Sequence, residues 1–254
     1  MAKEITQEHV LKDGTRLQIK QTTRKHGYNE AHKYTVAYPG KAFGPEMSSV
    51  TSLNHHSEGD TFGVGVGYAK KQIQQSNPLN FNAAQENTDR RIAEGNALHK
   101  CIENYINSKG QAIDEENDMF TAWLKDVGSK YTWVASEVLL YHPTLGYGGT
   151  ADAISVDVET VIWDWKSKSR ESYDKYGPEI YHKDHAQLAA YASALNSMGS
   201  IYTPTKANIA YIMDDGSYAE VVPVDLELST EVFELSYKMT GLVAVQKTSI
   251  KGRE

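Results

Sequence analysis

The segment VIWDWKSK, residues 161–168, constrains the fold of this 254-residue chain more than any other. Side chains alternate between the two faces of a β-strand, so Asp164 and Lys166 share one face with Ile162, while the two tryptophans occupy the other. Apolar residues on both faces indicate a central strand. A carboxylate and an ammonium near a sheet core are costly to desolvate unless they pair with each other or with a metal ion. The alternative is a surface salt bridge on an edge strand.

Hydrophobic periodicity and turn residues predict helices and strands on both sides of this segment. We expect helices at about 85–108, 115–127, 183–197 and 230–246, and strands at about 132–141, 147–156, 160–167, 206–213 and 218–224. Residues 14–38 predict a hairpin, and 39–82 form a loop-rich stretch with a short helical signal near 68–75. The order predicts an α/β (α+β) fold with a central mixed sheet flanked by helices, at 83–254, after an N-terminal appendage at 1–82.

Composition excludes several classes of protein. The formal net charge of -7 argues against a broad basic surface that coats nucleic acid, so any DNA contact is expected to be local. The single cysteine, Cys101, excludes an internal disulfide and an iron–sulfur cluster. No long apolar run or targeting signal is found, so we expect no membrane contact and a cytoplasmic location, in a bacterial or phage-infected cell.

A second acid lies in YGGTADAI, where a glycine pair precedes a strand that places Asp152 among small residues. Antiparallel pairing with the next strand would put Asp152 beside Asp164. Two carboxylates at so short a distance need a cation between them, or one of them stays protonated. Oxygen ligands favour Mg²⁺ or Mn²⁺. The alternative is two unrelated surface acids.

The sequence resembles the PD-(D/E)xK nuclease superfamily, in its RecB-type exonuclease branch. Three segments in combination carry this resemblance: GGTADAI, IWDWKSKS and QLAAYASAL. The resemblance implies a restriction-endonuclease-like core and a Mg²⁺- or Mn²⁺-dependent deoxyribonuclease. It implies that Asp152, Asp164, His99 and the carbonyl group of Trp165 hold the cation, while Lys166 orients the attacking water and offsets charge on the phosphate.

Two further site residues rest on the same resemblance. His99 follows Gly95 by one helical turn in RIAEGNALHK, as in the branch's metal-binding helix. A lone helical histidine is otherwise more often structural. Glu137 in SEVLLYH matches a catalytic acid that the branch carries on the strand before the one with Asp152. The alternative role for Glu137 is that of a strand acid that faces solvent.

The resemblance also predicts contacts with DNA. Gln187 and Tyr191 match the branch's Q-x-x-x-Y helix, although Tyr191 could instead be core. MSSVTSL resembles a Ser-Val-Thr element of the mitochondrial genome maintenance exonuclease and its phage relatives, and the alternative there is a Ser-rich loop. The residues expected to contact phosphates are Ser49, Thr51, Ser52, Arg91 and Lys168. A solvated basic face is the alternative for Lys168.

These features predict a metal-dependent DNA exonuclease that hydrolyses phosphodiester bonds in replication, repair or recombination. By the same resemblance it requires a free end and prefers single strands. One alternative is an endonuclease on the same fold. The other is a non-catalytic DNA-binding module, which would have lost an acid or the lysine, and here none is lost. The oligomeric state stays open.

Overall fold

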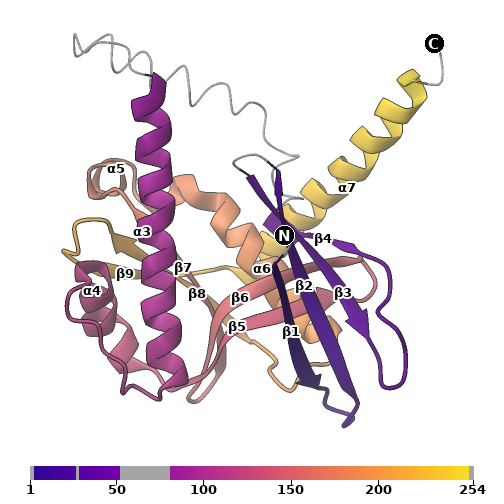
Figure 1. Cartoon of the computed structure of the whole chain (residues 1–254), viewed down its shortest axis with the longest axis horizontal. Coiled ribbons are helices and arrows are strands. Elements are labelled where there is room, and N and C mark those ends of the chain that lie inside the picture. The colour runs from indigo at the N-terminus through magenta and orange to yellow at the C-terminus, as the bar shows by residue number, and fades with distance from the viewer. Residues whose placement is uncertain (1–2, 27–28, 52–80, 252–254) are drawn as a thin grey trace.

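The computed structural model describes residues 3–26, 29–51 and 81–251 (Figure 1). The strands in this part of the chain are β1 Lys3–Val10, β2 Arg16–His26, β3 Asn29–Ala37, β4 Met47–Ser49, β5 Trp133–His142, β6 Tyr147–Val156, β7 Thr160–Lys168, β8 Lys206–Met213 and β9 Ala219–Pro223. The helices are α3 Phe81–Asn107, α4 Asp118–Asp126, α5 Arg170–Tyr176, α6 His182–Ser197 and α7 Leu226–Lys251, with short 3-10 turns at η2 Gly128–Lys130 and η3 Pro178–Tyr181.

The predicted central mixed sheet flanked by helices is confirmed, and all of these strands, including those of the N-terminal region, belong to it. Its order is β1-β2-β3-β4-β6-β7-β8-β9, with β5 paired to the other edge of β6. The three strands predicted at about 132–141, 147–156 and 160–167 are β5, β6 and β7, which are antiparallel neighbours, whereas β8 runs parallel to β7. β7 lies between β6 and β8, which agrees with the apolar residues on both of its faces.

Helices cover the two faces of the sheet (Figure 1). A separate cluster of buried hydrophobic residues lies on each face. On one face, Trp163 and Trp165 of β7 pack with Leu98 of α3 and Trp123 of α4. On the other face, residues such as Ile162 pack with the alanine- and leucine-rich side of α6. None of the described helices is both long and apolar enough to span a membrane.

The N-terminal strands extend the same sheet. The predicted hairpin is confirmed as β2 and β3, which pair from Gln18–Ala37 to His26–Asn29. β1 and β4 were not predicted. β1 is largely exposed and polar, and β4 has three residues that form a strand only through pairing with β3 and β6. The boundary at residue 82 stays a prediction, and the helical signal near 68–75 lies outside the described residues.

Candidate metal centre

The site lies where two central strands separate. The ladder between β6 and β7 ends at the pair Ala153–Trp163, while β7 continues to pair with β8 as far as Lys168. Asp152 and Asp164 occupy the next position in that register, just beyond the last pair. Strand register thus brings the two acids to one place, as antiparallel pairing had predicted.

Asp152 is tied to the backbone of β7. Its Oδ2 accepts a 2.6 Å hydrogen bond from the Trp165 N–H, and its Oδ1 lies 3.5 Å from Nδ1 of His99. The side chain is 11% exposed. Burial acts to raise the pKa of Asp152, but His99, Lys166 and the Trp165 N–H together hold it below its usual value. This carboxylate is therefore ionised and fixed in direction.

Asp164 and Lys166 form a buried ion pair. Lys166 Nζ lies 2.6 Å from Oδ2 of Asp164, and the side chains are 24% and 3% exposed. Burial raises the pKa of Asp164 to about 7. Burial acts to lower the pKa of Lys166, but the neighbouring carboxylates raise it instead, so this lysine stays charged. Oδ2 of Asp164 therefore has the Lys166 ammonium as its ionic partner, although this contact does not have good hydrogen-bond geometry.

His99 approaches the two acids from α3. Its Nε2 lies 3.1 Å from the carbonyl oxygen of Trp165, and its Nδ1 faces Asp152. Burial acts to lower the pKa of His99, but Asp152 raises it to about 9. Metal ligation needs the neutral imidazole, so a cation here competes with that proton. A Cβ at Gly95 would lie 3.5 Å from Ser167 Oγ, an ordinary contact, so close approach of the helix does not require this glycine.

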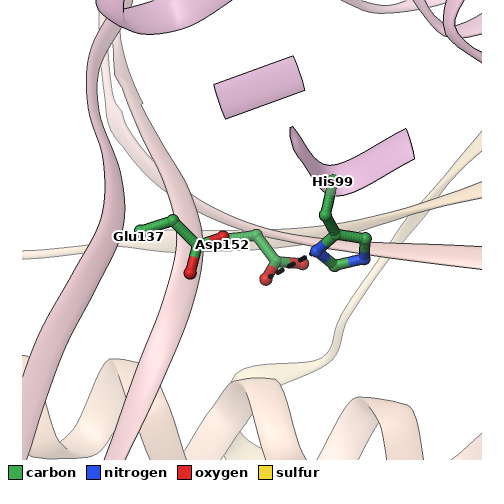
Figure 2. A group of neighbouring side chains, drawn as sticks. All are labelled: His99, Glu137 and Asp152. Carbon is green, nitrogen blue, oxygen red and sulfur yellow. Dashed lines mark ion pairs between the residues drawn. The ribbon is translucent and has the colours of Figure 1, made fainter. Parts of the chain in front are cut away.

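Glu137 completes the group from β5. Ligand atoms of His99, Glu137 and Asp152 all lie within 4.8 Å of one another (Figure 2). Burial and then Asp152 raise the pKa of Glu137 to about 7. Its backbone has a φ of 49°, a left-handed conformation that residues with a side chain rarely adopt. Outliers of this kind persist where the surrounding structure holds them, often at functional sites.

The donor set suits a hard divalent cation. Carboxylate oxygens, one carbonyl oxygen and one imidazole nitrogen are the ligand types that Mn²⁺ accepts, and Mg²⁺ prefers the oxygens among them. The cluster of ligand atoms contains Glu137, which was predicted as a catalytic acid. Asp164 lies at the adjoining register position and faces Lys166.

An open hollow of about 490 Å³ adjoins the cluster on the side of α3. Its lining includes His99 and Glu137 together with Lys3 and Lys100. The hollow is open to solvent, so the cluster can be reached from that side, and Lys100 is paired there with Glu103, which also lines the hollow.

Tyr191 and the glycine pair fit together behind the site. Tyr191 is 3% exposed, and its hydroxyl group accepts a 2.7 Å hydrogen bond from Gln187. A Cβ at Gly149 would lie 2.3 Å from Cε1 of Tyr191, and one at Gly148 would lie 2.4 Å from Cγ of Tyr34. The glycines are thus required by the rings that pack on β6. Tyr191 has the position of a core residue, the alternative considered for it, while Gln187 is half-buried.

The other predicted DNA contacts are spread around this group. Ser49 is 3% exposed within β4, and Thr51, two residues after that strand, is exposed, whereas Ser52 lies outside the described residues. Arg91 Nη2 lies 3.8 Å from Asp214. The roles assigned to these residues stay predictions.

Lys168 is held in place by groups that sequence reasoning missed. Its Nζ lies 2.8 Å from Asp184 Oδ2 and 3.6 Å from the ring centroid of Tyr181. Asp184 also raises the pKa values of Asp164 and Lys166. It stands in the first turn of α6, where an acid is expected for helix stability alone, so the sequence contained no signal for this contact.

Comparison with solved structures found several that resemble this chain, including the following two. The chain is similar to the crystal structure of LHK-Exo in complex with dAMP, with a TM-score of 0.35 and 12% identity over 81% of this chain and 94% of that one. It is also similar to an alkaline exonuclease (LHK-Exo) from Laribacter hongkongensis, with a TM-score of 0.30 and 15% identity over 58% of this chain and 84% of that one. No protein-family model and no curated protein matches the sequence. At these TM-scores neither likeness supports an inference about activity.

Proposed function

We propose that this protein is a Mg²⁺- or Mn²⁺-dependent DNA exonuclease of the PD-(D/E)xK type. The observation that supports this most is the meeting of Asp152, Asp164 and Lys166 where β6 and β7 separate. Phosphodiester hydrolysis gathers negative charge on the phosphate. A fixed ammonium is suited to stabilise that charge, and neighbouring carboxylates are suited to hold a cation.

The groups that would hold the cation are His99, Glu137, Asp152 and the carbonyl oxygen of Trp165, with the Asp164 carboxylate at the adjoining position. A bound Mg²⁺ or Mn²⁺ supplies Lewis acidity to a phosphoryl oxygen and lowers the pKa of a bound water. The observation that favours such a cation is the cluster of one imidazole and two carboxylates, whose ligand atoms all lie within 4.8 Å of one another.

Lys166 and Asp152 would have different roles in the reaction. Lys166 stays charged beside Asp164 and is placed to orient a water and to neutralise charge that develops on the phosphate. The Trp165 N–H fixes the carboxylate of Asp152, which keeps its oxygens in one orientation before substrate binds. Pre-organisation of this kind avoids reorganisation at the moment of reaction.

The substrate we propose is DNA with a free end, preferentially single-stranded. A chain with a net charge of -7 cannot hold duplex by general attraction, so binding depends on local contacts. Stacking of bases on aromatic side chains contributes about 1 to 3 kcal/mol per base and is available to a single strand. A strand that enters one local groove by its end gains these contacts in succession.

We expect linear single-stranded DNA to be degraded in Mg²⁺ or Mn²⁺, while closed circles of the same sequence persist, because threading needs an end. The measurement follows 5'- and 3'-labelled linear and circular strands on gels, with a chelator as the control that stops the reaction. Rapid loss of closed circles would instead indicate an endonuclease. Persistence of every substrate in both metals would indicate a non-catalytic DNA-binding module.

We also expect His99→Ala to raise the Mn²⁺ concentration needed for half-maximal cleavage by about tenfold or more, because the centre loses its imidazole ligand. Calorimetric titration of Mn²⁺ into the protein measures the same change without DNA. His182→Ala, at an exposed histidine at the start of α6, is the matched control. A His99→Ala variant that titrates like the parent would make His99 a structural residue.

A further inference from the structure

Gln7 in β1 reaches across to β5, although the two strands do not pair with each other. Its Oε1 accepts a 2.7 Å hydrogen bond from the Leu139 N–H, and its Nε2 donates a longer one, 3.4 Å, to the carbonyl oxygen of Glu137. Both contacts are to backbone groups, on either side of Val138. One side chain from the N-terminal strands thus engages the segment that presents Glu137.

β5 needs such a partner because one of its edges is open. Among the described strands it pairs only with β6, so the backbone groups on its other edge lack a ladder partner. The carbonyl of Glu137 and the N–H of Leu139 point to that same edge. A carboxamide has one acceptor oxygen and an NH₂ donor group, so Gln7 substitutes for the peptide unit of a residue in a neighbouring parallel strand.

The segment held in this way contains the backbone outlier of the site. Glu137 has a φ of 49°, and its extended alternative would be the easier conformation for a strand residue. In the conformation observed, the carboxylate lies within 4.8 Å of the ligand atoms of His99 and Asp152. A tether on the carbonyl of Glu137 and on the N–H two residues later restricts relaxation toward the extended form.

We propose that Gln7 is a positioning residue, which holds the backbone of Glu137 so that its carboxylate faces His99 and Asp152. This inference rests on the proposed function, since it takes Glu137 as part of the metal centre. It makes β1, in the region predicted to be a separate appendage, a contributor to the geometry of that centre.

The test is a double-mutant cycle that reads Mn²⁺ affinity by calorimetry. Gln7→Met keeps the length of the side chain and removes both hydrogen bonds. We expect it to weaken Mn²⁺ binding by about tenfold in the parent protein and by less than about twofold in a Glu137→Gln background, because residues that act through one another are not additive. Gln18→Met, at an exposed position of β2, is the matched control and should leave affinity unchanged.

One measurement and one further variant distinguish a positioning role of Gln7 from a general effect on the stability of the fold. Thermal unfolding of each variant shows whether it is folded, and Gln7→Asn, one methylene shorter, is a milder change if Gln7→Met does not fold. An equal loss of Mn²⁺ affinity in both backgrounds, or no loss while Glu137→Gln weakens binding, would overturn the role of Gln7 and leave the proposed function intact. If neither Glu137→Gln nor Asp152→Asn alters Mn²⁺ binding, the metal centre itself is refuted, and the role of Gln7 with it.

Discussion

Replacing Lys166 with alanine, or Asp164 with asparagine, is expected to reduce DNA cleavage by about a hundredfold or more, the scale of losing one contact to developing charge. Lys166 lies 2.6 Å from Asp164 and stays charged, so each variant removes one half of the same pair. Single-turnover rates in saturating Mg²⁺ measure the effect. The loss is expected in the rate of the chemical step, since Lys166 acts on the reacting phosphate.

The cleavage rates of the Lys166→Ala and Asp164→Asn variants can be interpreted only if both variants are folded. Lys166→Ala leaves Asp164 buried without its partner, but the pKa of Asp164 is already about 7, so this acid can take up a proton instead of destabilising the fold. Lys206→Ala, which removes an exposed lysine paired with Glu159, is the matched control and should keep normal turnover. Near-normal turnover in a folded Lys166→Ala variant would refute the assignment.

The second large effect is expected at Asp152. Asp152→Asn should weaken Mn²⁺ binding by about a hundredfold or more, because a buried ionised ligand is lost, and cleavage should fall with it. Asparagine can still accept the hydrogen bond from the Trp165 N–H, so the end of the β6–β7 ladder is preserved. Calorimetric titration with Mn²⁺ and cleavage assays over a range of metal concentration are the measurements.

Asp157→Asn provides the comparison for this variant. Asp157 is an exposed acid in the turn between β6 and β7, so its substitution makes the same chemical change outside the site. It should leave metal affinity and cleavage unaltered. A folded Asp152→Asn variant that binds Mn²⁺ like the parent would show that Asp152 is not a ligand.

Much of the central sheet and its helices could be predicted because their signals are local. The alternation in residues 161–168 placed Asp164 and Lys166 on one face, and β7 has that arrangement in the middle of the sheet. Hydrophobic periodicity predicted a helix at about 85–108, which contains His99, and α3 is that helix. β1 and β4 were missed for the opposite reason, since their strand structure depends on partners far along the chain.

The glycine pair Gly148–Gly149 shows what a local sequence pattern can and cannot predict. The sequence showed small residues before Asp152 and indicated crowding. It did not show that the ring of Tyr191 fills the space over Gly149, or that Tyr34 fills the space over Gly148. In each of these contacts the two residues are more than forty positions apart in the sequence. No periodicity within a single helix or strand encodes such a contact.

The sequence by itself determined which side chains share a face of one strand or one helix, because those relations follow from the repeat of the backbone. Only the tertiary structure decided which faces meet. The end of the β6–β7 ladder puts Asp152 against the Trp165 N–H, α6 brings Asp184 to Lys168, and β1 brings Gln7 to the backbone beside Glu137. Each of these contacts depends on strand register and helix docking, which are set by the packing of the whole core and not by any one segment.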